Sequence, residues 1–154
     1  MTQVSDPSET KTNLDERAIA QAMFCQTLSS TELQQLSPGA LAYLGDAVYE
    51  LYIRRYYLIP SKRIQAYHQQ VVSQVRAETQ AHHLNQLLPF LTSTELDLLK
   101  RGRNAAASRP KRIDPDTYQR ATSLETLIGY LYLSDLHRLM ELLDYLKIES
   151  TNIC

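Results

Sequence analysis

The chain has little of several features that mark special classes of protein. Two cysteines, Cys25 and Cys154, occur in 154 residues, and they are too few and too far apart to predict a disulfide framework. No apolar run approaches the ~18 residues of a membrane-spanning helix, and the polar N-terminus lacks the apolar segment of a signal peptide. These absences predict a soluble, cytoplasmic protein with free thiols and no membrane association.

Glycine is also scarce, with four residues in the chain, whereas Leu, Ala, Gln and Glu form long runs. This composition favours helices, and no segment alternates between apolar and polar residues as a strand would. The length fits one domain with an ordinary hydrophobic core. We therefore predict an all-α fold, with a flexible tail over residues 1–13 and a single domain over residues 14–150.

Local signals predict where the helices begin and end. Ser37 before Pro38 is a cap followed by a first-turn proline, and the helix that it opens should reach about Tyr57 because Pro60 cannot continue it. Five further boundaries are expected: a cap at Ser61, a break near Ser73, a helix from Thr92 to about Arg101, a helix from Asp116 or Thr117 to about Leu133, and a cap at Ser134.

The formal net charge of −1 hides a local concentration of basic residues. Of the 16 Lys and Arg residues, six lie between Lys100 and Arg112, a stretch that contains no acid. We expect Gly102 to end the preceding helix, so that this stretch forms an exposed loop. Such a patch either contacts phosphate groups or is an ordinary solvated face.

Two acids lie within strongly apolar helical segments. Asp46 stands in the segment 41–51, LAYLGDAVYEL, and Glu125 stands in the segment 124–131, LETLIGYL. Burying a carboxylate is costly unless a cation or a hydrogen-bonding partner compensates it. Gly45 and Ala42 leave room next to Asp46 for a partner helix or a ligand. Glu125 is surrounded in the same way by Ala121, Thr122 and Gly129. The pattern predicts that the two helices cross and that the inward-facing acids share a divalent cation.

Oxygen ligands favour magnesium or manganese, and a small number of protein ligands suits magnesium, which keeps several waters and binds substrate phosphate. Such an ion activates water and stabilises charge on phosphate oxygens, so phosphodiester hydrolysis is the expected chemistry. The alternative is structural: Asp46 pairs with Arg54 or Arg55, and Glu125 is a rim residue. Glu50 and Arg54, four positions apart, predict a pair on the helix surface.

With these residues in place, the sequence resembles a known family. The segment LAYLGDAVYE (41–50) resembles the signature helix of the ribonuclease III family, and LETLIG (124–129) resembles its second acidic helix. The segments 99–105, 110–111, 117–118 and 127–131 are similar to those of Mini-ribonuclease III, the short form without a double-stranded-RNA-binding domain. The match runs in order from about residue 38 to 146.

The resemblance implies a homodimeric ribonuclease III endonuclease-domain fold that cuts double-stranded RNA with Mg²⁺, for which Mn²⁺ can substitute. It implies that Asp46 is the catalytic aspartate and Glu125 the metal-binding glutamate. The implied role is maturation of the ends of the large-subunit (23S) ribosomal RNA precursor, with a ribosomal protein or the assembling large subunit as a further candidate partner. The implied RNA-binding residues are Lys100, Arg101, Arg103, Asn104, Arg109 and Lys111.

The chain departs from the larger members of the family at two positions. They carry further acids where Ala42 and Thr122 stand here, and the short members share this reduced set. Water and RNA phosphate should then complete the coordination of the cation, which predicts weak metal affinity without substrate. Two other functions stay open: a non-catalytic RNA-binding or ribosome-assembly protein with this fold, and a purely structural dimerisation module. The expected dimer interface is the segment 41–52.

Overall fold

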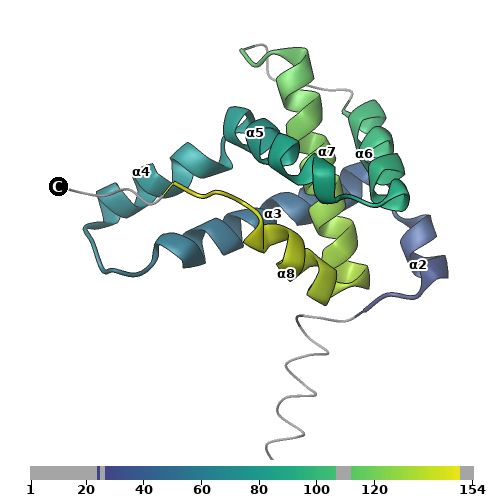
Figure 1. The fold of residues 1–154 in the computed structure, drawn as a ribbon, viewed down its shortest axis with the longest axis horizontal. Helices are drawn as coiled ribbons and strands as arrows, with labels where there is room; N and C mark the ends of the chain where they lie inside the picture. The colour runs from purple at the N-terminus through teal and green to yellow at the C-terminus, as the bar shows by residue number, and fades with distance from the viewer. Residues whose placement is uncertain (1–23, 25–26, 107–111, 150–154) are drawn as a thin grey trace, which may run out of the picture.

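The computed structural model describes residue 24, residues 27–106 and residues 112–149 of the chain. The expected tail, residues 1–13, lies outside these ranges. Every regular element within them is helical, which confirms the all-α prediction (Figure 1). In chain order the elements are α2 (Ser30–Gln35), α3 (Pro38–Tyr57), α4 (Ile64–Val75), α5 (Ala77–Leu87), the short 3₁₀ helix η1 (Leu88–Phe90), α6 (Ser93–Ala105), α7 (Pro115–Ser134) and α8 (Leu136–Asp144).

Helix α7 lies at the centre of the fold. It crosses α3, and in the view of Figure 1 α5 and α6 flank its N-terminal half while α8 lies beside its C-terminal half. Nine residues between Ala121 and Leu131 are buried. A helix enclosed by neighbours on most sides has to be apolar or small all round. The buried residues of this segment meet that need, because they are apolar or, at Thr122, Ser123 and Thr126, small.

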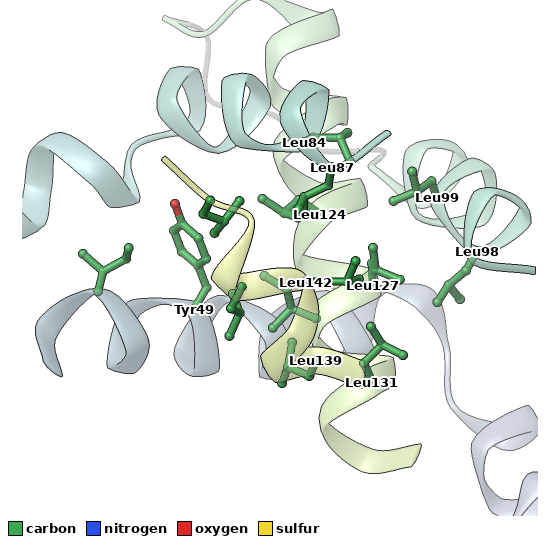
Figure 2. Close-up of a cluster of buried hydrophobic side chains, with 14 of the residues drawn as sticks. Tyr49, Leu84, Leu87, Leu98, Leu99, Leu124, Leu127, Leu131, Leu139 and Leu142 are labelled. Atoms are coloured by element: carbon green, nitrogen blue, oxygen red, sulfur yellow. The ribbon is translucent and has the colours of Figure 1, made fainter. Parts of the chain in front are cut away.

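One hydrophobic core joins the elements around α7. Tyr49 of α3, Leu124 and Leu127 of α7 are fully buried, and leucines of α5, α6 and α8 pack with them (Figure 2). Burial of each such side chain contributes roughly 1.5–3 kcal/mol. In the described residues no helix is both long and apolar enough to cross a membrane.

The crossing of α3 and α7 is unusually close because two glycines meet there. A Cβ atom on Gly45 would overlap the carbonyl oxygen of Glu125, and it would lie 2.8 Å from the backbone nitrogen of Gly129. A Cβ atom on Gly129 would overlap the carbonyl oxygen of Leu41 in the same way. Any side chain at either glycine would force the helices apart. The crossing therefore fixes the position of Asp46, the residue after Gly45, relative to α7.

The expected boundaries of α3 are confirmed, and the expected cap of α4 is wrong. The Ala40 N–H donates to Ser37 Oγ over 3.1 Å, and α3 ends at Tyr57. Helix α4 begins three residues after Ser61, with no side-chain cap. The ammonium group of Lys62 instead donates to the Tyr57 carbonyl, which holds this segment in the connection between the two helices.

The break between α4 and α5 falls at Arg76, three residues beyond the expected position. Thr92 caps α6 as expected, in a reciprocal pair of hydrogen bonds with Glu95. Helix α8 is capped by Asp135, whose carboxylate accepts from the Arg138 N–H, and not by Ser134. Ser134 is instead the last residue of α7, and its hydroxyl donates to the Tyr130 carbonyl inside that helix.

The prediction that Gly102 ends a helix and opens a loop is wrong, because α6 continues to Ala105. Gly102 is buried against α7, where a Cβ atom would lie 2.5 Å from Thr126 Oγ1 and 3.1 Å from the Ser123 Cα atom. The glycine serves close packing between two helices, not chain reversal. Helix α7 begins at Pro115, capped by the Asp114 carboxylate, within one or two residues of the predicted start.

Candidate active site

Asp46 and Glu125 line the same pocket, as the sequence predicts. The pocket has a volume of about 360 Å³ and lies between the N-terminal part of α3, the end of α6 and the N-terminal half of α7. The close α3–α7 crossing at Gly45 and Gly129 brings the two acids to it. The lining residues are Gly39, Ala42, Tyr43, Asp46, Ala105, Ala106, Tyr118, Thr122 and Glu125.

The two acids differ in their access to solvent. Glu125 is partly buried on α7, whereas Asp46 is exposed on α3 at the rim of the pocket. The expectation that both acids face inward therefore holds for Glu125 and is wrong for Asp46. Asp46 is one turn of α3 from Ala42, and this side of the helix faces the open pocket instead of the core. One carboxylate thus lies deeper and the other lies where solvent or a ligand enters.

Both carboxyl groups have raised pKa values. Burial raises the pKa of Glu125 to about 7, the Asp46 charge adds to the rise, and a hydrogen bond from the Gln80 side chain opposes it. Partial burial, followed by repulsion from Glu50, raises the pKa of Asp46 above its ordinary value. Each acid is thus costly to ionise, and the two repel each other. A bound cation would relieve both costs.

The structural alternative for Asp46 is not met in the described residues. Arg54, its proposed partner, donates from Nε to Glu50 Oε1 over 2.9 Å, which is the surface pair that the sequence predicts. Within the described ranges, no ion pair involves Asp46 or Glu125, with Arg55 or with any other cation. Among the described residues, neither carboxylate has the paired positive charge that usually compensates a partly buried acid.

The donor set of the pocket suits a hard divalent cation with few protein ligands. The described residues contain no group of three or more His, Cys, Asp or Glu side chains that could hold a metal. Ala42 and Thr122, which stand where the larger relatives carry acids, both line the pocket. Two carboxylates in a pocket that also has room for water and a phosphate group fit magnesium better than a metal that needs a closed protein shell.

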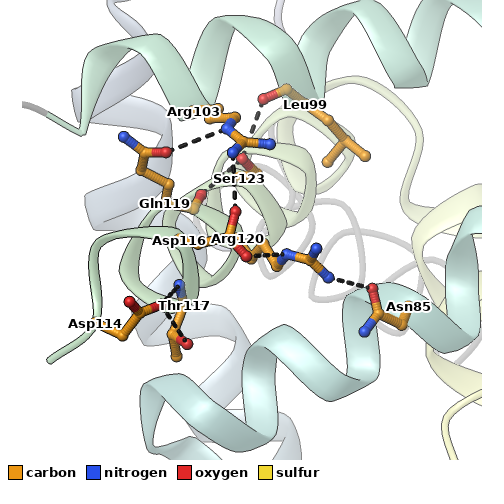
Figure 3. A network of polar contacts seen from close by, with 9 residues as sticks. All are labelled: Asn85, Leu99, Arg103, Asp114, Asp116, Thr117, Gln119, Arg120 and Ser123. Atoms are coloured by element: carbon orange, nitrogen blue, oxygen red, sulfur yellow. Dashed lines mark hydrogen bonds and ion pairs between the residues drawn. The ribbon is translucent and has the colours of Figure 1, made fainter.

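Two of the expected RNA-binding residues, Lys100 and Arg103, are paired with acids in the described part of the structure. The basic stretch 100–112 contains no acid, but the fold brings acids from outside it into contact with its side chains. Arg103 pairs with Asp116 over 2.8 Å and donates from Nε to Gln119 over 3.1 Å, and Asp116 also pairs with Arg120 (Figure 3). Arg103 thus joins the end of α6 to the start of α7.

The other expected RNA-binding residues fall into three groups. Lys100 is exposed and pairs with Asp97 over 3.0 Å. Arg101 and Asn104 are exposed on the last turns of α6, the helix whose end lines the pocket. Arg109 and Lys111 lie outside the described residues. Of the four that can be placed, Arg101 is an exposed cation with no ion-pair partner in the described ranges.

Two residues of the site were not identified from the residue pattern. Tyr118 lines the pocket opposite Asp46, and its only sequence signal is the family resemblance of the segment 117–118. Gln80 lies on α5, is buried, and opposes the rise in the pKa of Glu125. A glutamine in a polar, Gln-rich helix gives no sign that it will be buried against an acid of another helix, so pattern alone could not find it.

Comparison with known proteins agrees with this geometry. Residues 39–136 match the model of the ribonuclease III domain. A Mini-ribonuclease 3 of Synechocystis sp. is 57% identical over 116 residues, which cover 75% of this chain and 81% of the relative. A Mini-ribonuclease 3 of Synechococcus sp. is 53% identical over 121 residues, which cover 79% and 88% of the two chains.

The fold also resembles a solved structure. A crystal structure of a protein from Fusobacterium nucleatum superposes with a TM-score of 0.67 at 30% identity, covering 71% of this chain and 92% of that one. The matched domain model spans both acidic helices, α3 and α7, and therefore contains the whole pocket. The chain belongs to the ribonuclease III family, and within it to the endoribonucleases of the Mini-ribonuclease 3 type.

Proposed function

We propose that this endoribonuclease cuts double-stranded RNA with a divalent cation, Mg²⁺ or in its place Mn²⁺, held between Asp46 and Glu125. The observation that carries the proposal is a pair of carboxylates in one pocket, each with a raised pKa and neither with an ion-pair partner in the described residues. A site that keeps two uncompensated acids together is poorly arranged for stability and well arranged for a cation.

The two acids have different tasks in this proposal. Glu125, the deeper group, has to lose its proton before it can hold a cation, so its pKa sets the pH below which the site loses affinity. Asp46, at the rim, is placed where an RNA phosphate would enter. The cation, when bound, would supply an activated water and charge stabilisation at the phosphate. Ala42 and Thr122 add no charge, which leaves coordination positions for water and RNA oxygens.

The RNA backbone is proposed to lie across the mouth of the pocket and the end of α6. Arg101 and Asn104 are exposed there. Lys100 and Arg103 would have to exchange Asp97 and Asp116 for phosphate groups, so their contribution should be smaller. Arg109 and Lys111 lie outside the described residues, and their RNA contacts stay a prediction from the sequence. Duplex RNA is read mainly through its shape and its 2′-hydroxyl groups, so we expect modest sequence selectivity.

A second copy of the chain is proposed to pack on α3. Tyr43, Ala47 and Leu51 follow one another at intervals of four, so they share one side of the helix, and all three are exposed. Tyr43 is 86% exposed and Leu51 is 67% exposed. Leu51 also borders an apolar groove of about 470 Å³ between α3 and α8. A continuous apolar surface of this kind is typical of a dimer interface.

A two-fold axis through this interface would relate two pockets and direct them at opposite strands of one duplex. The proposed cellular substrate is the precursor of the large-subunit (23S) ribosomal RNA, in the cytoplasm, with a ribosomal protein or the assembling large subunit as a further partner. Support for this substrate comes from the similarity to the Mini-ribonuclease 3 proteins.

The direct test is magnesium-dependent cleavage of a double-stranded RNA precursor by Asp46→Asn and Glu125→Gln. Both variants should lose cleavage while still binding the duplex. Glu50→Gln is the matched control, because Glu50 is one turn from Asp46 on the same helix but pairs with Arg54 and does not line the pocket. Unimpaired cutting by either variant of the acid pair would refute the assignment.

Further outcomes of the same experiment separate the alternative functions. Salt-sensitive binding of duplex RNA without any magnesium-dependent product from the wild type would favour a non-catalytic RNA-binding protein. Absence of both binding and product would favour a purely structural dimerisation module.

A further inference from the structure

A second pocket, of about 390 Å³, lies between α5, α6 and α7. It is lined by apolar and basic side chains, and no acid is among its lining residues. The apolar part consists of Leu84, Leu88, Leu96 and Leu99. The basic part consists of Lys100, Arg103 and Arg120. We call it the leucine–arginine pocket.

The leucine–arginine pocket lies on the side of α7 that faces away from the candidate active site. Tyr118, Thr122 and Glu125 line the catalytic pocket, whereas Arg120 and Ser123 line the leucine–arginine pocket. Residues three or four apart share one side of a helix, and residues two apart lie on roughly opposite sides. Because α7 separates the two pockets, a ligand of the leucine–arginine pocket is distinct from a group held between the two catalytic acids.

Two arginines of this pocket share a single carboxylate. Arg103 pairs with one oxygen of Asp116 over 2.8 Å, and Arg120 pairs with the other oxygen over 2.7 Å (Figure 3). Gln119 accepts a hydrogen bond from Arg103 over 3.1 Å, and Asn85 accepts one from Arg120 over 2.8 Å. The cluster therefore holds two positive charges against one negative charge, and two neutral amides fix the directions of the guanidinium groups.

The arginine pair can bind a further anion. Each guanidinium group has five N–H donors, and the bonds to Asp116, Gln119 and Asn85 use only part of this capacity. Among the described residues, neither arginine has another hydrogen-bond or ion-pair partner. A second carboxylate at the pair would balance the local charge, and guanidinium groups bind carboxylates through parallel hydrogen bonds.

The leucines show that the ligand is more than an anion. Leu84 and Leu99 are buried in the pocket, while Leu88 and Leu96 are 41% and 37% exposed beside it. Nucleic acid fits this surface poorly, because bases stack mainly on aromatic side chains and none lines the pocket. Apolar surface bordered by polar groups, with arginine among them, is typical of a site for another protein.

We propose that the leucine–arginine pocket docks an acidic segment of another protein. The segment places one apolar side chain against the four leucines and a carboxylate at Arg103 and Arg120. Charge complementarity decides the kind of partner, since three cations and no acid line the pocket. The inference goes beyond the proposed function and does not depend on it, because neither Asp46 nor Glu125 takes part.

The probe is a phage-displayed library of random short peptides, selected on the full-length protein. The enriched peptides should contain an apolar residue within one helical turn of Asp or Glu. The most enriched peptide is then synthesised with a fluorescent label, and its Kd is measured by anisotropy. Replacing its acids by amides, or its apolar residue by alanine, should weaken binding about tenfold, and these changes leave the protein untouched.

Two variants of the protein locate the binding site. Arg120→Gln should raise the Kd of the peptide about tenfold, and Leu96→Gln should raise it roughly fivefold. The matched controls are Arg63→Gln and Leu58→Gln, which remove an exposed arginine and an exposed leucine outside the pocket and should leave the Kd unchanged. RNA cleavage by Arg120→Gln and Leu96→Gln should match the wild type, which also shows that both variants fold.

Three outcomes would overturn the inference. The first is a selection that enriches no acidic, apolar peptide. The second is an unchanged Kd in Arg120→Gln, or in the peptide that lacks its apolar residue, because acids would then be attracted to basic residues without using the pocket. The third is displacement of the peptide by a short duplex RNA whose own binding depends on Arg120 and Leu96, which would assign the pocket to RNA.

Discussion

Replacing Glu125 by glutamine should stabilise the metal-free protein at alkaline pH while it abolishes cleavage. The folded protein holds the Glu125 proton up to a pKa of about 7, whereas the unfolded chain releases it near the ordinary value of 4.5. Between these two values the folded state binds more protons than the unfolded state, so its stability falls as the pH rises. Glutamine has no proton to lose, and the fall should disappear.

The size of the effect follows from the difference between the two pKa values. A rise from 4.5 to about 7 corresponds at most to about 3 kcal/mol. Glu125 is only partly buried, and solvent reduces the effect, so we expect Glu125→Gln to gain about 2 kcal/mol over the wild type between pH 5 and pH 8. In a domain of this size that gain corresponds to a rise in Tm of roughly 4–8 °C at pH 8.

The assay is urea and thermal unfolding in a chelating buffer at both pH values. Glu50→Gln, which removes an acid that pairs with Arg54 on the helix surface, is the control and should show no such pH-dependent gain. Adding Mg²⁺ at pH 8 should stabilise the wild type and not Glu125→Gln, because binding to the folded state alone raises stability. Equal stability of Glu125→Gln and wild type at pH 8, or an equal gain at both pH values, would refute the reasoning.

Four further substitutions test other parts of the structure. Gly45→Ala should destabilise the fold by about 1–3 kcal/mol by denaturant unfolding, because its Cβ would overlap the Glu125 carbonyl and displace α3 from α7; unchanged stability and cleavage would contradict the close crossing. Leu51→Glu should convert a dimer to a monomer in light scattering without loss of helical signal, since Leu51 is exposed; an unchanged mass would exclude this face as the interface. Arg101→Ala should reduce the salt dependence of RNA binding by about one phosphate contact, whereas Arg103→Ala should mainly lower thermal stability, because Arg103 pairs with Asp116; the reverse pattern would contradict these roles.

Local sequence signals predicted the parts of the fold that depend on neighbouring residues. Ser37 and Pro38 open α3 and Thr92 opens α6, because each cap is satisfied by backbone groups within the same turn. The cap at Ser61 and the break at Gly102 were wrong for different reasons. Lys62 donates to the Tyr57 carbonyl five residues earlier, at the end of α3, and α4 begins only at Ile64. Gly102 packs against Thr126 of α7, a tertiary contact that the local sequence does not indicate.

For the candidate site, the sequence predicted which two acids come together but not how exposed each one is. The pairing of Asp46 with Glu125 followed from two acids in apolar helices beside Gly45 and Gly129, since small residues permit the crossing that brings them together. The exposure of Asp46 did not follow, because a helical pattern gives the side on which a residue lies and not what covers that side.

The most direct test of the central claim is a crystal of the protein soaked in Mn²⁺, with anomalous scattering recorded at the manganese edge. We predict a cation in the pocket of α3 and α7 that is coordinated by a carboxylate oxygen of Asp46 and one of Glu125, with water in its remaining positions. Density for manganese elsewhere, with both carboxylates turned away from the pocket, would contradict the account.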